Sequence, residues 1–210
     1  MTKLLRLGFF AIVIRTLMVL VLGLNVRGRE KLPAKGPAII LANHNSHLDT
    51  LSLMSLFPLS SLDSIKPVAA LDYFLSSKPF AWFALNIIGI LPINRKGGGN
   101  PLAGSIEALQ NGDILILFPE GSRGLPEEMS EFKRGAELLC KMNPQVPVYP
   151  AFMHGLGKAL PKGTWLLVPF ILDIFIGEPF TYQDVGKKFM TRLQDDVQAL
   201  ADQGNFPAWE

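Results

Sequence analysis

A ten-residue stretch, LANHNSHLDT from Leu41 to Thr50, concentrates groups that can move protons or bind a metal ion. It holds two of the chain's three histidines, His44 and His47, together with Asp49. The residues just before it, GPAII, are apolar and typical of a buried strand, so the cluster is predicted to follow a strand end. Three interpretations fit these residue types: a metal site, a general base held by a carboxylate, or a loop that is merely polar.

The favoured interpretation pairs His44 with Asp49. If a helix begins soon after the strand, Asp49 lies one turn along it, and its carboxylate can accept from one imidazole nitrogen. The other nitrogen can then take a proton, a contribution worth about 10²–10⁴-fold in rate. Ser122 in EGSRG resembles a nucleophile elbow, but Glu120 stands where the first glycine of that motif would be. The group that His44 deprotonates is therefore expected to be a substrate hydroxyl.

A metal site is the less favoured interpretation. His44 and His47 would share a helix face near Asp49, which is a possible ligand set. However, the chain has one cysteine, and His154 lies far along the sequence with no carboxylate beside it. Further ligands would have to come from distant loops. No resident metal is expected, and a metal-dependent hydrolase using His44, His47 and Asp49 stays an alternative.

A second polar cluster, FPEGSRG, spans Phe118–Gly124. A buried strand is predicted to break at its proline and to deliver Glu120, Ser122 and Arg123, while glycines such as Gly121 let the backbone approach a ligand. A carboxylate beside a guanidinium suits a polyol phosphate, with the carboxylate on hydroxyls and the guanidinium on phosphate. The alternative is a turn with a surface ion pair.

Other basic residues are placed where they could add to a phosphate site. Arg95 ends the apolar run ILPINR, and Lys133 and Arg134 follow in EFKRGA. Any one of them is more often a solvated surface charge, but several near one pocket would attract a phosphate.

Apolar runs of strand length alternate with helix-like stretches along the chain. Strands are predicted in residues 37–43, 66–71, 90–95, 113–121, 146–153 and 169–180, and helices in residues 47–57, 72–89, 100–112, 130–142 and 181–204. This pattern predicts a single α/β domain with a mixed, largely parallel sheet covered by helices. Functional loops gather beyond the C-terminal ends of strands in such sheets, so the polar loops outline one pocket. Pro147 and Pro150 fit a rigid edge strand as well as a substrate role.

The N-terminus is apolar and basic. Its first 35 residues carry one acidic residue, Glu30, against seven basic ones, Lys3, Arg6, Arg15, Arg27, Arg29, Lys31 and Lys35. Arg15 interrupts the apolar run where a charge in a bilayer core is costly, and no small-residue cleavage site follows. Residues 1–25 are therefore predicted to form a membrane-associating helix that lies in or dips into the headgroup layer, with residues 26–210 as the main domain. The alternative is a packed helix of the domain.

Composition sets broader limits. The chain has 210 residues, 49% of them hydrophobic, and a mean hydropathy of +0.28, which suggests a membrane surface nearby. The single cysteine, Cys140, excludes an internal disulfide framework and suits a reducing compartment.

Four blocks, in this order and spacing, resemble the glycerolipid acyltransferases of the 1-acylglycerol-3-phosphate acyltransferase (PlsC) type. Residues 43–49 match the family's NHx₄D block, and Phe118 to Arg123 is similar to its FPEGTR block. Gly89 to Arg95 resembles the block that ends in arginine, and Val146 to Pro150 resembles VPVxP. The resemblance covers about Val26 to Phe180.

The resemblance implies that His44 is the catalytic base and Asp49 its partner, in direct transfer from an acyl thioester without an acyl-enzyme. Acyl-CoA or acyl-carrier protein would be the donor substrate, with no other cofactor and no nucleic-acid partner. A membrane lysophospholipid would be the acceptor, at the cytoplasmic face of the inner or plasma membrane. The acceptor is assigned to a set of six residues, Arg95, Glu120, Gly121, Ser122, Arg123 and Lys133.

The departures from the family lie in the acceptor blocks. Pro92 and Asn94 replace a common aromatic residue and aspartate, Ser122 replaces threonine, and Gly124 replaces serine. Lysophosphatidic acid is the expected acceptor; another lysophospholipid or a lyso-amino-acid lipid is the alternative. A membrane-bound lipid-binding protein without turnover is a further alternative.

Overall fold

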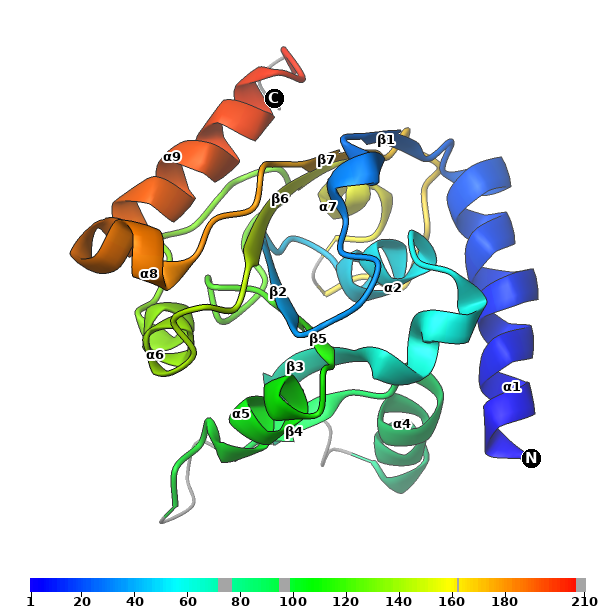
Figure 1. The fold of residues 1–210 in the computed structure, drawn as a ribbon. Helices are drawn as coiled ribbons and strands as arrows, with labels where there is room; N and C mark the ends of the chain where they lie inside the picture. The colour runs from blue at the N-terminus through cyan, green and yellow to red at the C-terminus, as the bar shows by residue number, and fades with distance from the viewer. Residues whose placement is uncertain (72–76, 95–98, 162, 207–210) are drawn as a thin grey trace.

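The computed structural model describes residues 1–71, 77–94, 99–161 and 163–206 (Figure 1). Within them a seven-stranded sheet has the order β1-β7-β6-β2-β5-β3-β4. All its neighbouring strands pair in parallel except β6 and β7. The strands are β1 (Asn25–Arg27), β2 (Ala38–Ala42), β3 (Ile65–Ala70), β4 (Leu91–Ile93), β5 (Ile114–Leu117), β6 (Val148–His154) and β7 (Asp173–Ile176). The predicted α/β domain with a mixed, largely parallel sheet is confirmed.

Helices cover both faces of this sheet. In Figure 1, α6 and α9 lie on one side of β2, and α2 and the N-terminal helix lie on the other. The N-terminal helix comprises α1 (Thr2–Gly8), η1 (Phe9–Ile14) and η2 (Leu17–Val21). The remaining helices are η3 (Arg29–Lys31), α2 (Leu48–Ser55), η4 (Leu59–Ser64), α4 (Lys78–Phe83), η5 (Ala84–Ile88), α5 (Ala103–Gln110), α6 (Gly135–Met142), α7 (Leu156–Ala159), α8 (Tyr182–Val185), η6 (Gly186–Lys188) and α9 (Phe189–Asp202).

Strand β2 divides the core because its side chains alternate between the two faces. Ile40 belongs to the cluster formed with α2 and the N-terminal helix, whereas Ile39 and Leu41 belong to the cluster formed with α5, α6 and α9. All five residues of β2 are fully buried. The strand that leads into the histidine loop is therefore fixed from both sides.

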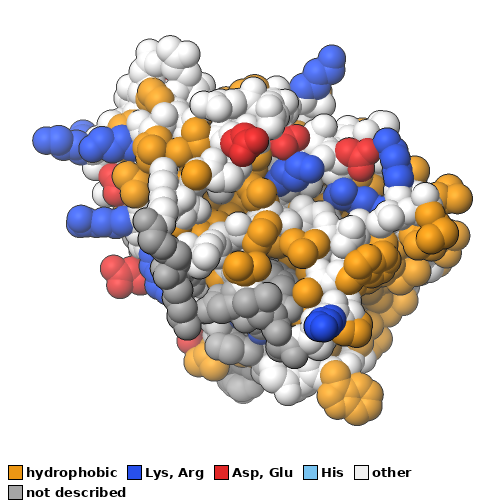
Figure 2. Space-filling model, turned by 90° about the horizontal axis from the view of Figure 1, so that it is seen from below, with side chains coloured by type: hydrophobic (Ala, Val, Ile, Leu, Met, Phe, Trp, Pro, Cys, Tyr) orange, Lys and Arg blue, Asp and Glu red, His pale blue; other side chains and the backbone are white. Residues whose placement is uncertain are grey.

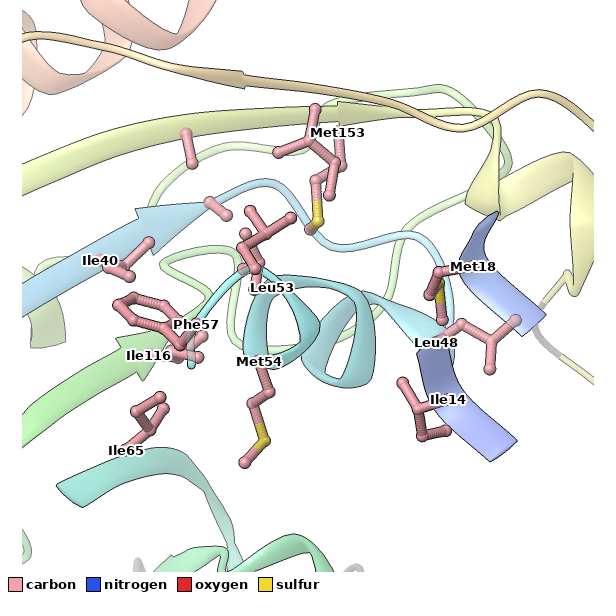
Figure 3. Packing of buried hydrophobic residues seen from close by; sticks show 14 of the residues in the cluster. Ile14, Met18, Ile40, Leu48, Leu53, Met54, Phe57, Ile65, Ile116 and Met153 are labelled. Atoms are coloured by element: carbon pink, nitrogen blue, oxygen red, sulfur yellow. The ribbon is translucent and has the colours of Figure 1, made fainter. Parts of the chain in front are cut away.

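Helix α2 follows the histidine loop and is held between the sheet and the N-terminal helix. Figure 3 shows Phe57, just after α2, beside Ile40 and Ile116 of the sheet, and Leu48 of α2 beside Met18 of the N-terminal helix. The first turn of α2, which carries Asp49, is thereby anchored in the core.

One strand prediction was wrong. The prolines of VPVYPAF suggested an edge strand, but β6 lies between β2 and β7. Pro150 is tolerated there because it lies one residue before Ala151, which forms the last β6–β7 pair with Ile176. Its carbonyl still accepts from the Gly177 N–H at 2.8 Å. Its missing N–H therefore lies where the β6–β7 ladder is interrupted, before pairing resumes between Val148 and Phe180.

Two helix predictions differ at their boundaries. The helix predicted from Asn100 begins at Ala103, because the Asn100 side chain accepts from the Leu102 N–H at 3.0 Å and forms a turn. The single C-terminal helix is divided near Gly186, whose φ of 52° falls in the left-handed region. Of the helix predicted over residues 72–89, residues 78–88 are helical and residues 72–76 lie outside the described part of the chain.

Candidate active site

The two polar loops leave the sheet side by side. Strands β2 and β5 are neighbours, and Leu41 pairs with Leu117, so the histidine loop and the FPEGSRG loop begin at the same edge. The His44 ring stacks on the Phe118 ring, with centroids 4.0 Å apart. The Gly124 N–H donates to the His44 carbonyl at 2.8 Å. The sheet register therefore unites segments about 75 residues apart, as the strand-end argument predicts.

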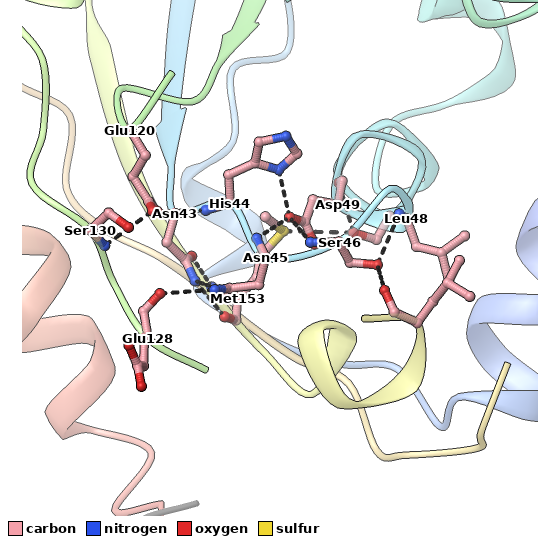
Figure 4. Close-up of polar contacts among 12 residues, drawn as sticks. Asn43, His44, Asn45, Ser46, Leu48, Asp49, Glu120, Glu128, Ser130 and Met153 are labelled. Carbon is pink, nitrogen blue, oxygen red and sulfur yellow. Dashed lines mark hydrogen bonds and ion pairs between the residues drawn. The ribbon is translucent and has the colours of Figure 1, made fainter. Parts of the chain in front are cut away.

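His44 and Asp49 form the predicted pair. The His44 Nδ1 and Asp49 Oδ2 atoms are 2.8 Å apart (Figure 4). The same carboxylate oxygen accepts from the backbone N–H groups of Asn45 at 2.7 Å and Ser46 at 2.9 Å. Asp49 is almost fully buried, whereas the His44 side chain is 19% exposed. With Nδ1 engaged, Nε2 is the nitrogen left to accept a proton from a ligand.

His47 lies at the start of α2, as its N-cap residue. Partial burial, followed by the positive charge of Arg123 and by His44, lowers the pKa of His47 to about 4. It is therefore neutral near pH 7. Across the described ranges, no three His, Cys, Asp or Glu side chains converge as a metal would require.

Glu120 has a structural role that its sequence position did not reveal. It is buried, and its two oxygens accept from the backbone N–H of His44 at 2.7 Å and of Ser130 at 3.0 Å (Figure 4). Burial raises the pKa of Glu120, and these hydrogen bonds partly offset the rise. The carboxylate thereby joins the histidine loop to the segment that follows FPEGSRG. Its contact with substrate hydroxyls stays a prediction.

The structure describes all the other predicted acceptor residues except Arg95. Gly121 has a φ of 73°, and a Cβ there would lie 3.1 Å from Lys133 Nζ, so the lysine crosses the loop where glycine leaves room. Ser122 is exposed and Arg123 is partly buried near His47. Arg95 lies outside the described residues. The structure thus brings Gly121 and Lys133 together and leaves the position of Arg95 open.

Two asparagines of LANHN were not assigned a role from sequence. Asn45 Nδ2 donates to the carbonyls of Leu125 at 2.6 Å and Glu128 at 2.8 Å. Asn43 Nδ2 donates to Asn45 Oδ1 at 3.0 Å, and the Asn43 side chain exchanges two hydrogen bonds with the Met153 backbone. Asn45 thereby holds the Leu125–Glu128 segment, and Asn43 holds Asn45. The segment lines a hollow of about 370 Å³, bordered by Arg123, Gly124, Leu125, Pro126, Glu128 and Ser130.

His154 corrects a statement made from sequence. It was expected to have no carboxylate beside it, but its Nδ1 lies 2.7 Å from Glu127 Oε2. Glu127 also accepts from the N–H groups of Gly155 and Lys158. Burial would raise the pKa of Glu127, but the His154 hydrogen bond and its other partners lower it below the usual range. This pair fixes the far side of the Leu125–Glu128 segment to the end of β6.

Replacing Glu120 by glutamine tests its bridging role. An amide has one acceptor oxygen, so its NH₂ must face the N–H of either His44 or Ser130. The variant is expected to lose about 1 kcal/mol of unfolding free energy, because one of these part-buried donors loses its acceptor. Urea unfolding would measure the loss. The exposed Glu128→Gln control should stay within about 0.5 kcal/mol of wild type, and equal losses in both variants would contradict the bridge.

Comparison with known proteins adds an independent line of information. The family model described as Acyltransferase matches residues 23–154. A 1-acyl-sn-glycerol-3-phosphate acyltransferase of Pseudomonas aeruginosa is 30% identical over 179 residues, covering 83% of this chain and 65% of the relative. The chloroplastic 1-acyl-sn-glycerol-3-phosphate acyltransferase LPAT1 of Arabidopsis thaliana is 30% identical over 145 residues, covering 67% of this chain and 38% of the relative. The chain thus spans about two fifths to two thirds of the length of these relatives.

A solved structure supports the fold. The crystal structure of PlsC, the 1-acyl-sn-glycerophosphate (LPA) acyltransferase from Thermotoga maritima, matches with a TM-score of 0.77 and 21% sequence identity. The match covers 99% of this chain and 81% of that chain. The seven-stranded sheet and the N-terminal helix therefore belong to one shared architecture.

Proposed function

Because this chain belongs to the acyltransferase family, we propose that it transfers a fatty acyl group from a thioester to the free hydroxyl of lysophosphatidic acid, giving phosphatidic acid. The observation that carries the proposal is the 2.8 Å contact between His44 Nδ1 and Asp49 Oδ2, on a loop bonded to the FPEGSRG loop. The names of the relatives support the choice of acceptor.

His44 Nε2 takes the proton of the acceptor hydroxyl as its oxygen attacks the thioester carbonyl. The new C–O ester bond forms, the C–S bond breaks, and the departing thiolate takes the proton from the imidazolium. Asp49 holds the ring through Nδ1 and stabilises its positive charge. Acyl-CoA or acyl-carrier protein supplies the thioester as a substrate, with no resident metal or other cofactor.

An acyl-enzyme would need a hydroxyl or thiol as its nucleophile, and two such groups are held in ways that do not suit this role. The buried Ser46 Oγ donates to the Leu160 carbonyl at 2.9 Å. The Cys140 thiol is buried on α6, and burial raises its pKa to about 12. Neither group is prepared as a nucleophile, which favours direct transfer to the acceptor.

The acceptor phosphate is assigned to the basic groups around the second loop. Arg123 and Lys133 supply two of these charges. Arg95, which lies outside the described residues, is assigned to the acceptor from the sequence alone. Membrane attachment would bring the enzyme to this lipid. The N-terminal helix Thr2–Val21 is 20 residues long and apolar enough to enter a bilayer, and the proposed location is the cytoplasmic face of the inner or plasma membrane.

A second acceptor class is favoured by the sequence departures at Pro92, Asn94 and Gly124. In that case the His44 chemistry is unchanged, and another lysophospholipid or a lyso-amino-acid lipid takes the place of lysophosphatidic acid.

Acyl transfer by the purified, detergent-solubilised chain tests the proposal. Radiolabelled lysophosphatidic acid is offered with palmitoyl or oleoyl thioester in the presence of EDTA. Phosphatidic acid is the expected product. Product from another lysolipid alone would move the assignment to the second acceptor class, and no transfer to any acceptor by folded protein would contradict the enzyme assignment.

A further inference from the structure

The segment that links α7 to β7 exposes large apolar side chains to solvent. Within residues 163–171, Trp165 is 92% exposed, Leu166 66% and Ile171 64%. Single exposed apolar residues are ordinary, but a contiguous group of this size marks an interaction surface. We call residues 163–171 the tryptophan segment.

The tryptophan segment continues the exposed side of the N-terminal helix. The Leu172 N–H, just after the segment, donates to the Leu22 carbonyl at 2.9 Å. A Cβ on Gly23 would lie 3.9 Å from the Ile171 side chain. The outer side of the helix is also apolar, with Ile12 70% and Leu20 77% exposed. Because the segment adjoins the C-terminal end of the helix at Ile171 and Leu172, we treat the exposed apolar side chains of both as one apolar face.

The same face extends past the other end of the helix. Phe9 of the N-terminal helix meets Phe83 of α4 edge to face, with ring centroids 5.3 Å apart. Close to this contact, Trp82 of α4 is 49% exposed and Leu85 of η5 is 43% exposed. Figure 2 shows hydrophobic side chains gathered at the right of the molecule, the side on which Figure 1 places the N-terminal helix.

The charged residues of the apolar face indicate which kind of partner it fits. Residues 2–21, 77–94 and 163–172 contain no Asp or Glu, and their charged residues are Lys3, Arg6, Arg15 and Lys78. Asp63 of η4 pairs with Lys3 and Arg6. Arg6 is buried, so the charged side chains that these residues expose are Lys3, Arg15 and Lys78. Because all three are positive, the face complements an anionic lipid surface. A second copy of the chain would instead bring like charges together.

The packing of the N-terminal helix decides between lying on and crossing a bilayer. Phe10, Ile14, Met18 and Leu22 recur every four residues and are at most 2% exposed. Arg15 Nη2 donates to the Phe57 carbonyl at 2.9 Å. A helix that crossed the bilayer would have to leave these contacts, so it must instead dock together with the domain.

We propose that the tryptophan segment inserts Trp165 and Leu166 into the same leaflet as the N-terminal helix, so that the chain binds one face of an anionic bilayer. The inference rests on the proposed function, because a lipid acceptor gives the surface its use. Tryptophan suits this position, since its ring prefers the boundary between headgroups and acyl chains.

Docking by this segment also places the catalytic loop. Ser46 Oγ donates to the Leu160 carbonyl at 2.9 Å, and the Val168 N–H donates to the Ala159 carbonyl at 2.8 Å. These bonds join the histidine loop to the chain that leads into the tryptophan segment. Insertion therefore holds His44 near the headgroup layer, where the hydroxyl of a lysolipid lies.

Trp165 itself supplies the test, because the chain has only two other tryptophans, Trp82 and Trp209. With both replaced by phenylalanine, the protein is mixed with phosphatidylcholine–phosphatidylglycerol vesicles. Trp165 emission is expected to shift to the blue and to be quenched by lipids brominated on the acyl chain. Emission that stays at its water-exposed maximum while the protein sediments with vesicles would overturn the proposal. So would a blue shift that follows protein concentration without vesicles, which would identify a second copy as the occupant.

A matched pair of variants gives a second readout. Leu166→Asp is expected to weaken vesicle binding by about tenfold or more, because burial of a leucine is lost. Leu138→Asp, at a 52% exposed leucine on α6, should bind as wild type does. Equal binding by both variants would contradict insertion. Neither vesicle measurement needs turnover, so insertion without acyl transfer would contradict the proposed function alone, and acyl transfer without insertion would contradict this inference alone.

Discussion

His44→Ala is expected to lower the turnover rate for acyl transfer by about 10²–10⁴-fold, because the variant lacks the base that takes the hydroxyl proton. The backbone bonds of residue 44, to Glu120 Oε1 and from the Gly124 N–H, do not depend on the side chain. The loop should therefore keep its shape. Initial rates at saturating donor and acceptor would measure the loss, and circular dichroism would confirm the fold.

His47→Ala is the matched control for this loss. His47 is an exposed histidine three residues further on, and its side chain makes no capping hydrogen bond to α2. With a pKa of about 4 it is neutral near pH 7, whereas His44 is the histidine whose Nδ1 faces the Asp49 carboxylate. The variant should keep turnover within a few-fold of wild type. Equal losses in the two variants would contradict the assignment of His44 as the base.

The histidine–aspartate pair could be predicted from sequence because its geometry is local. Once a strand ends before His44 and a helix begins after Ser46, the five-residue separation leaves Asp49 within reach of the ring. The alternating apolar strands and helices predicted the α/β sheet for the same reason: each element is set mainly by its own residues. Helix starts were less certain, as Asn100 shows, because one side-chain bond can move them.

Contacts between distant loops could not be predicted in this way. Glu120 looks like a substrate ligand in FPEGSRG, yet its bond to the His44 N–H joins residues 76 positions apart. Glu127 contacts His154 in a segment that Asn45 holds through the carbonyls of Leu125 and Glu128. Such contacts depend on strand order, and no local pattern specified that β6 lies inside the sheet. In the sequence, the asparagines on either side of His44 in LANHN were the one indication of such contacts.

The N-terminal helix shows why the sequence left two predictions open for the same residues. The apolar, basic run suggested a membrane surface, with a packed helix as the alternative. Met18 is fully buried against the domain, whereas Leu20 is 77% exposed. A run that is apolar all round predicts burial but cannot distinguish protein from lipid as the partner of each side. The structure thus shows one side of the helix packed against the domain, and lipid contact on the outer side stays a prediction.

Asp49→Asn is expected to reduce turnover nearly as much as His44→Ala. Asp49 Oδ2 accepts from the N–H groups of Asn45 and Ser46 as well as facing His44 Nδ1. All three contacts fall on this one oxygen, so an amide oxygen in its place can accept from the same three donors but carries no negative charge. The imidazolium that forms when Nε2 takes the substrate proton then loses the charge that stabilises it. A loss of about 10²–10⁴-fold follows from this weaker base.

A double variant separates this loss of charge beside His44 from independent damage. If Asp49 acts through His44, then His44→Ala with Asp49→Asn should be no slower than His44→Ala alone. Losses that multiply would contradict coupling through the ring. Asp184→Asn is the matched control, because Asp184 also accepts a backbone N–H in the first turn of a helix, from Thr181, but is exposed. It should cost about 0.5–2 kcal/mol of stability at most and leave turnover unchanged, since its carboxylate orients no base.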